Sequence, residues 1–355
     1  MAVQFALQRR LDISFLRSSL TFAAGLLLGG VLCVALLVQA GVPADMLFED
    51  LVWQVFFQTD GLAQTLTLSI PLILAGLSAA LALRVKFWNI GIEGQLWLGA
   101  IAAMAVSING IGGESYRWVL MLLAAMAGGA VWIAIPLWLK ERFHASELVV
   151  TLLLTNVAYQ LLQHLLFGVW RDPTQSFPIS PAITASERLT KLGFGNLHTG
   201  LFVSIGMVLL VMWIMERSRF GFQSRVLGAN RRVAEASGIA VGTTLVVMVL
   251  LSGAMAGLAG GLLVAGTEYR LTQHLGWNMT FSGIVIAFIA RFRPFWVLPV
   301  AVVLAGVYNA GASLKVFYGL TEATVLLMQG IVLLSLLWCQ FMAAFRIDRR
   351  KEVTV

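Results

Sequence analysis

One carboxylate lies where an apolar segment would otherwise continue. Glu93 stands between two apolar runs, in the stretch Phe87–Gln95, with two glycines and an asparagine within four residues of it. A charge at membrane depth costs several kcal/mol, with estimates from about 3 to more than 10, unless it faces a cavity or a partner. Glycines weaken a helix, and membrane proteins tolerate broken backbone mainly where it lines protein or a water-filled path. This combination points to a solute moving through the membrane rather than to a chemical reaction.

The segment 148–168 carries a second set of polar groups. Its polar side chains recur at every fourth residue, with others one residue further round: Thr151, Thr155, Tyr159 and Gln163, then Asn156, Gln160 and His164. Residues four apart stack on one helix face, so the pattern predicts a polar stripe through a membrane span. The alternative is hydrogen bonding between helices, typically worth about 0.6 kcal/mol per contact. Because so many polar residues share one side, we favour a path for a polar solute, with Asn89, Glu93 and Gln95 as further path residues.

The sequence contains no constellation typical of an enzyme. The four histidines have no ligand spacing, and Cys33 and Cys339 both lie in apolar spans, so neither a metal site nor a disulfide framework is expected. The phosphate-binding pattern Gly-x4-Gly-Lys-[Ser/Thr] is absent, so we do not expect this chain to hydrolyse ATP. The sequence therefore predicts a transport protein without a cofactor.

Composition places the chain in a membrane. Apolar residues make up 59% of 355 positions and charged residues 12%, and the mean hydropathy is +0.88. Several apolar runs are close to the 20 or so residues that cross a hydrocarbon core of about 30 Å. The ten expected spans are 18–40, 61–83, 92–108, 117–139, 148–168, 199–215, 240–265, 281–290 with flanks, 295–312 and 322–344. The predicted fold class is an all-α polytopic membrane protein of about ten transmembrane helices, and the span at 281–290 is short for a full crossing.

The basic residues predict the orientation. With the N-terminus in the cytoplasm, about three quarters of the 24 Lys and Arg residues fall in inside segments, as the positive-inside rule requires. Both termini are then cytoplasmic. We expect a tail at 1–17, one transmembrane domain at 18–344 and a second tail at 345–355. This topology explains the pI of 9.8, so nucleic-acid binding is not needed to account for it, and membrane lipid is an expected partner.

Glycines mark two patterns of helix arrangement. In span 240–265, Gly253, Gly257 and Gly261 form a small-x3-small seam that lets two helices approach closely, which we take as structural. A weaker echo precedes spans three and eight, where Trp-Asn is followed by glycine at the same distance: Trp88, Asn89 and Gly94, then Trp277, Asn278 and Gly283. This echo suggests an inverted repeat of helices 2–5 and 7–10, an arrangement common in transporters.

Three segments outside the spans are long enough to meet other surfaces. The segment 169–198 is rich in turns and predicts a cap or a docking surface, and 44–60 has the spacing of an amphipathic helix on the outer surface. The cytoplasmic segment 216–238 carries five arginines, short helical stretches, and glycines at 221, 228 and 238 as breaks. It could simply touch lipid headgroups, but its length also suits a short helix in another protein's groove.

The residues of this chain resemble the signature of permease subunits of bacterial ABC importers, in the family that handles nucleosides, simple sugars and branched-chain amino acids. The resemblance covers about residues 60–340 in collinear order. It rests on Asn89–Gln95 with Leu98–Ala100, Ser146–Thr151, Phe220–Ile239, Leu251–Gly260 and Gly283–Pro294. The form Asn-Ile-Gly-Ile-Glu-Gly-Gln looks most like the nucleoside-type branch, and the sugar permeases are the nearest rivals.

The resemblance implies a machine in the bacterial inner membrane with several other components. These would be ATP-binding cassette ATPase subunits, a second permease that is identical or different, and a periplasmic or lipid-anchored solute-binding protein. The segment 216–238 would hold the helix that couples to the ATPase. Its residues nearest the contact would be Arg225, Gly228, Asn230, Arg231 and Arg232. Nucleosides or related purines and pyrimidines would be the solute.

The residues are also compatible with two other classes of function. Glu93 and the broken third span also suit an ion-coupled secondary transporter. A membrane scaffold without a path is the third reading. Uptake into vesicles separates the three: it depends on the ATPase in the first, collapses with an ionophore in the second, and is absent in the third.

Overall fold

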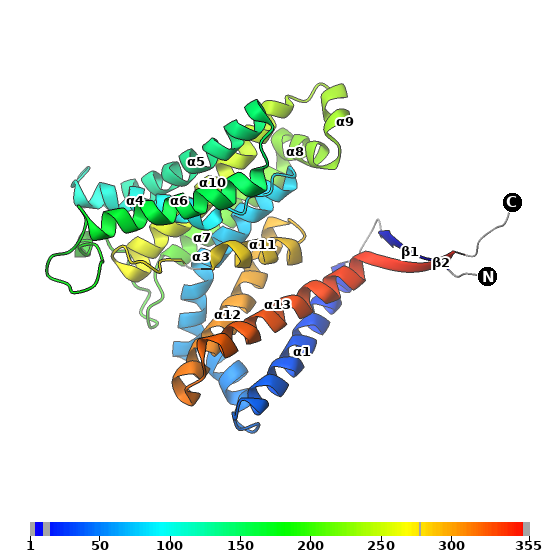
Figure 1. Cartoon of the computed structure of the whole chain (residues 1–355), viewed down its shortest axis with the longest axis horizontal. Helices are drawn as coiled ribbons and strands as arrows, with labels where there is room; N and C mark the ends of the chain where they lie inside the picture. Colours follow the sequence, from blue (N-terminus) through cyan, green and yellow to red (C-terminus); the bar gives the residue numbers. More distant parts are fainter. Residues whose placement is uncertain (1–3, 10–14, 277, 351–355) are drawn as a thin grey trace. The chain divides into compact units, whose positions relative to one another are not determined.

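The structure is a computed structural model that describes residues 4–9, 15–276 and 278–350 (Figure 1). The chain divides into two compact units, Phe56–Gly306 and the pair Met1–Val55 with Val307–Val355. Parts of the predicted tails, at 1–3, 10–14 and 351–355, lie outside the described residues, and so does Trp277 of the sequence echo.

The larger unit is built from helices joined by turns and one long connection. Its elements in chain order are α3 (Thr59–Arg84), α4 (Ile92–Ile108), α5 (Arg117–Phe143), α6 (Glu147–Phe167), the short η2 (Ala185–Glu187), α7 (Gly200–Arg217), α8 (Arg219–Ala229), α9 (Arg231–Ala236), α10 (Val241–Leu262), its π-helical continuation η3 (Leu263–Glu268), α11 (Met279–Ile289) and the first part of α12 (Pro294–Tyr318). The long apolar helices match the expected spans to within a few residues, except that α12 continues six residues beyond position 312.

The described residues confirm the predicted fold class. Eight of their helices are long and apolar enough to span a membrane, and α4 and α11 are shorter apolar helices. The 11 residues of α11 rise about 17 Å, well short of a hydrocarbon core of about 30 Å. The segment 281–290 is therefore a half-length helix. Ten crossings and the cytoplasmic position of both termini remain predictions.

Two helices occupy the centre of the larger unit. The most apolar window of α3 is 83% buried and that of α10 with η3 is 78% buried, against 17–28% for α5, α6 and α7. A helix that is apolar on all sides is stable where protein or lipid surrounds it. The outer helices therefore present apolar side chains to lipid, and α3 and α10 supply the packed interior.

Helix α10 packs so closely on α5 that the backbones of the two helices are in contact. A Cβ at Gly257 would overlap the carbonyl oxygen of Ala125, and a Cβ at Gly261 would lie 2.6 Å from Ala125 Cβ. Gly253 lies in the same way against Gly129. Small residues at such positions allow transmembrane helices to approach closely. These glycines hold the interior against which the candidate site is built.

The smaller unit contains a pair of long helices, and a pair of short strands adjoins these helices in the sequence. Its elements are β1 (Gln4–Arg9), α1 (Phe15–Gln39), η1 (Glu49–Trp53), the first residues of α2 (Gln54–Phe56), the end of α12, α13 (Glu322–Ala344) and β2 (Phe345–Arg350). Gly25 of α1 lies against Leu336 of α13, and β1 pairs with β2 in antiparallel register. Only the first four residues of β2, Phe345–Asp348, alternate apolar and polar side chains as a strand pattern would. The two strands were not expected within the two tails.

Candidate functional site

The chain that leads into α4 is non-helical over residues 87–91 and contains a buried amide pair. Asn89 Nδ2 donates to Gln95 Oε1 at 2.9 Å, and Gln95 Nε2 donates to Asn89 Oδ1 at 2.7 Å. Asn89 also donates to Ser252 Oγ at 3.1 Å, and Ser252 donates to the Ser78 carbonyl at 2.8 Å. All four side chains are buried. Two of the predicted path residues thus join α3, α4 and α10 to one another.

Glu93 lies where the starts of α4 and α11 meet. Its N–H donates to Thr280 Oγ1 at 3.0 Å, and its Oε1 accepts from the Thr280 N–H at 3.1 Å. The half-buried carboxylate is therefore at the N-termini of two helices, whose dipoles favour a negative charge. Two short helices with non-helical approaches are the arrangement that many transporters place near the middle of the membrane.

The first half of the α6 stripe packs on α4. Thr151 is buried and accepts a hydrogen bond from the Ile90 N–H at 3.2 Å. Thr155 donates to the Thr151 carbonyl at 3.0 Å, and its Cα lies against Gly94. These two threonines therefore contribute to the contact between α4 and α6.

The second half of the same row consists of Tyr159 and Gln163. The Tyr159 ring packs on Trp97, with ring centroids 5.3 Å apart. Within the described part of the chain, the buried Gln163 Oε1 and Trp132 Nε1 make no hydrogen bond, and Trp132 Nε1 lies beside Gly94 of α4. Buried polar atoms are normally paired, so such an atom marks a place for water or a ligand. The described residues thus leave a donor of α5 and an acceptor of α6 without a hydrogen bond.

The neighbouring row of the stripe does not join this group. Asn156 is exposed and its Nδ2 donates to the Leu152 carbonyl at 3.1 Å. Gln160 and His164 are exposed as well. The structure therefore separates the seven polar residues into a row that faces α4 and a row on the surface of the unit.

The basic segment between α7 and α10 folds into α8 and α9 (Figure 1). Asn230 lies between them, and its Oδ1 accepts from the N–H groups of Arg232 at 2.9 Å and Val233 at 3.4 Å. A side chain in this position satisfies the free N–H groups of a helix start. Asn230 thus fixes the geometry of α9.

Two glycines of this segment have a different role from the one expected. The interpretation of Gly221 and Gly228 as breaks is wrong, because α8 runs through both. A Cβ at Gly228 would overlap the carbonyl oxygen of Arg84, and one at Gly221 would overlap that of Met215. They are small because other backbone lies against them.

Arginines cover the outer side of α8 and α9. Arg225, Arg231 and Arg232 are exposed. Arg231 pairs with Glu235 at 3.1 Å and lies 3.9 Å from Glu141. Exposed pairs of this kind contribute about 0–1 kcal/mol, so they hold the arginines only weakly. An open hollow of about 560 Å³ adjoins them, lined by Lys140, Glu141, His144, Ala145, Ser146, Glu147 and Arg231.

Sequence reasoning missed three polar residues that hold these parts together: Ser252, Thr280 and Arg84. Each makes its contacts to segments more than 100 residues away, which no local pattern reveals. One signal was present for the third. The small residues at 221, 224 and 228 recur at i, i+3 and i+7, so they share one face of α8. Such a face predicts close packing.

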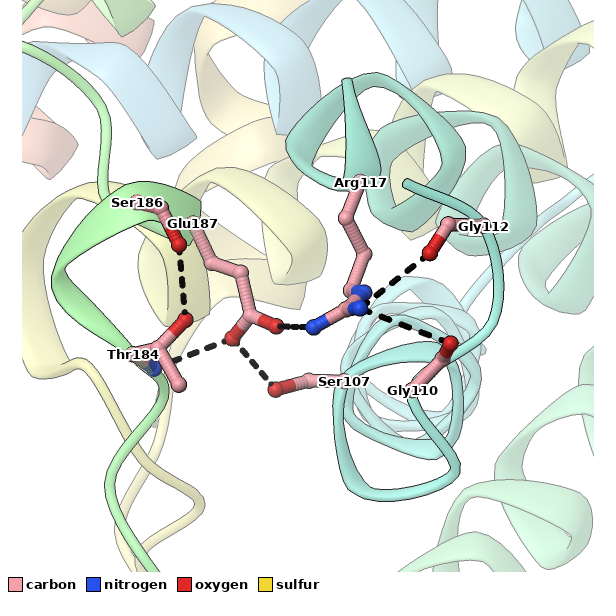
Figure 2. A network of polar contacts seen from close by, with 7 residues as sticks. All are labelled: Ser107, Gly110, Gly112, Arg117, Thr184, Ser186 and Glu187. Carbon is pink, nitrogen blue, oxygen red and sulfur yellow. Dashed lines mark hydrogen bonds and ion pairs between the residues drawn. The ribbon is translucent and has the colours of Figure 1, made fainter. Parts of the chain in front are cut away.

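At the other end of the unit, the connection between α6 and α7 is fastened by a buried ion pair (Figure 2). Glu187 Oε1 lies 2.8 Å from Arg117 Nη1. Its Oε2 accepts from Ser107 Oγ at 2.6 Å and from the Thr184 N–H at 3.0 Å. Burial alone would raise the pKa of Glu187, but these hydrogen bonds outweigh it and lower the pKa below its usual value. The carboxylate is therefore ionised and fully paired.

A buried histidine fastens the same connection to η3. His198 Nδ1 accepts from the Gly200 N–H at 3.2 Å, so its proton is on Nε2, which lies 3.2 Å from Thr267 Oγ1. Burial, and to a lesser degree the charge of Lys191, lowers the pKa of His198 to about 4. The ring is neutral at physiological pH.

Comparison with known proteins identifies the class of this chain. The family model described as branched-chain amino acid transport system / permease component matches residues 61–337. The chain belongs to this family and is thus a multi-pass inner-membrane permease, a component of transport rather than of catalysis.

Several relatives are similar over most of the chain. A glucose ABC transporter permease protein of Haloferax volcanii is 33% identical over 93% of this chain and 90% of its own length. A guanosine ABC transporter permease protein of Bacillus subtilis is 30% identical over 74% and 77%. A nucleoside ABC transporter permease protein of Lactococcus lactis is 27% identical over 81% of each chain. The chain is therefore similar to permeases for both sugars and nucleosides.

Proposed function

We propose that this chain forms the translocation path of an ATP-driven importer for a small, uncharged polar solute, with nucleosides as the leading class. The unpaired buried atoms of Trp132 and Gln163 carry this proposal. They are a donor on α5, beside Gly94 of α4, and an acceptor on α6, four residues after the aromatic ring of Tyr159. A nucleoside presents the matching features, because it has hydroxyl and amide groups beside a flat ring.

Other path residues act as the frame of this site. Asn89 and Gln95 hold the start of α4, Glu93 holds the start of α11, and Thr151 and Thr155 seat α6. Asn156 lies on the neighbouring row of α6. In this arrangement a shift of the α4 start would move the surface of α4 on which α6 and the Tyr159 ring pack.

The partners follow from the same proposal. Arg225, Arg231 and Arg232 would contact the ATPase subunit, and Asn230 would set the shape of the contact, while Gly228 lets α8 pack on the carbonyl of Arg84. A second permease, identical or different, would complete the path. The connection between α6 and α7 would face the solute-binding protein, and the apolar outer helices would face lipid.

Simple sugars are the second candidate class, because a glucose permease aligns with 93% of this chain. Both classes are neutral and rich in hydroxyl groups. Direct uptake measurements distinguish the two classes.

The test is uptake into proteoliposomes that contain the complete transporter and ATP. We expect labelled guanosine to accumulate, to depend on hydrolysis by the ATPase, and to be insensitive to an ionophore. Accumulation of glucose in place of guanosine would select the sugar class. Uptake that persists with an inactive ATPase and collapses with the ionophore would contradict the proposal in favour of ion coupling.

A further inference from the structure

Arg84, the last residue of α3, connects that helix to the corner between α7 and α8. Its Nε donates to Ser224 Oγ at 3.2 Å. Its Nη2 donates to the carbonyls of Gly221 at 3.4 Å and Met215 at 3.5 Å. The planar guanidinium thus contacts three residues of one corner, and such a fork holds its partners in a defined orientation.

The backbone around Arg84 is joined to α8 as well. The carbonyl oxygen of Arg84 lies so close to Gly228 that any side chain there would overlap it. Two residues further on, Lys86 Nζ donates to the Ala229 carbonyl at 3.2 Å, at the C-terminus of α8 where a cation is favourable. The end of α3 therefore holds both ends of α8.

From this joint, the chain runs directly into the candidate site. Only the residues 85–88 separate Arg84 from Asn89, which is hydrogen-bonded to Gln95 and Ser252. Lys86 in this turn has a φ of 58°, a conformation that few residues other than glycine adopt and that marks a constrained turn. A displacement of α8 thus reaches the start of α4 through a short and constrained segment.

We infer that Arg84 is a positioning residue that transmits motion of α8 and α9 to the start of α4. The inference rests on the proposed function and adds a defined mechanical link to it. The weak surface pairs of Arg231 let α9 adapt to a partner, whereas the half-buried guanidinium makes α8 and the turn at 85–88 move together. Transport then requires this joint even when the ATPase is bound and active.

The test measures ATP hydrolysis and solute uptake in the same reconstituted transporter. In Arg84→Gln, we expect the ATPase to copurify and to hydrolyse ATP at a rate close to that of the unaltered complex, while uptake per ATP falls by about tenfold, within the usual range of coupling between sites. Arg219→Gln is the matched control, because Arg219 is exposed on the same helix, and should leave the ratio unchanged.

A second pair of variants tests the backbone side of the joint. Gly228→Ala should uncouple uptake from hydrolysis in the same way, because its Cβ displaces α8 from Arg84. Gly242→Ala is the control, because a Cβ there meets nothing within 4 Å. Unchanged uptake per ATP in both Arg84→Gln and Gly228→Ala would overturn the inference. So would a parallel loss of ATPase binding and hydrolysis, since the joint would then serve docking or folding alone.

A cross-linking experiment tests the inference even if both Arg84→Gln and Gly228→Ala misfold. Lys86→Cys with Ala229→Cys, in a background with alanine at positions 33 and 339, can be bridged with a short bis-thiol reagent. Because the two positions move together, we expect the bridged transporter to retain uptake. Loss of uptake on bridging would overturn the inference. Uptake by the unaltered complex tests the proposed function separately.

Discussion

The larger unit handles charge in two opposite ways at the Glu187 network and at α8 and α9. Glu187 is buried, and both its carboxylate oxygens are paired with Arg117, Ser107 and Thr184 (Figure 2). The arginines of α8 and α9 are exposed, and the pairs of Arg231 are weak. Charges that are paired internally stabilise a fixed shape, whereas exposed charges are available to a partner.

Under the proposed function, this difference separates a static region from one that the ATPase drives. Breaking a buried pair leaves an uncompensated charge and destabilises the fold, but changing an exposed charge leaves the fold intact and alters association. Variants in the two regions should therefore affect different measurements. The following expectations run from the largest effect on stability to the smallest.

Glu187→Gln should destabilise the protein most. Arg117 would lose its buried partner, and the free energy of unfolding should fall by about 3–5 kcal/mol. Thermal unfolding in detergent measures this loss. Glu235→Gln, which removes an exposed partner of Arg231, is the matched control and should change stability by no more than about 0.5 kcal/mol. Equal effects of the two variants would remove the distinction between the regions.

Acid should weaken the connection between α6 and α7 through His198. The pKa of His198 is about 4 in the folded protein and near 6.5 in the unfolded chain. Between pH 4 and 6.5 the unfolded state therefore binds more protons than the folded state. Stability should therefore be complete above about pH 6.5 and fall as the pH decreases towards 4, by up to about 3 kcal/mol. In His198→Asn this part of the pH dependence should disappear. His164→Asn, at an exposed histidine, should retain this pH dependence. An unaltered protein whose stability did not change between pH 6.5 and 4 would refute the expectation.

Arg231→Glu combined with Arg232→Glu should leave stability within about 0.5 kcal/mol, because both side chains are exposed. The reversed charge should nevertheless detach the ATPase. Copurification of the two subunits provides the measurement, with monodispersity of the permease as the control for folding. If the variant retains the ATPase, the coupling role of α9 is wrong.

Gln163→Leu should have the smallest effect on the fold. It removes a buried acceptor that has no hydrogen-bond partner in the described residues, so stability should not decrease, while uptake should weaken. Gln160→Leu, at an exposed position three residues earlier, should leave uptake unchanged. Equal uptake kinetics in both variants would assign the whole α6 stripe to helix packing.

Local sequence patterns predicted the helices better than the contacts among them. Hydropathy located the spans because burial in lipid needs long apolar runs, and the glycine spacing of Gly253 and Gly257 indicated close packing. The contacts of Glu187 with Arg117 and of Glu93 with Thr280 join residues far apart in the chain, so no periodicity reports them. Gly221 and Gly228 were misread because a glycine that breaks a helix and one that permits close approach look alike in sequence.

The polar stripe of α6 shows the same limit. Its spacing correctly placed Thr151, Thr155, Tyr159 and Gln163 on one helix face, yet it could not say which neighbour that face meets. The answer depends on tertiary contacts. Gly91 and Gly94 at the start of α4 lie against Thr151 and Thr155, whereas Gln163 lies further along α6. Side-chain pairing follows from tertiary packing, which a single helix pattern does not contain.

Hydrogen exchange in the assembled transporter compares the two regions most directly. When the ATPase is bound and trapped with ATP, the amides of residues 219–236 should exchange more slowly than in the permease alone. The amides at 184–188 should be equally protected in both samples. Unchanged exchange at 219–236, with protection gained at 184–188 instead, would contradict the assignment of the static and driven regions.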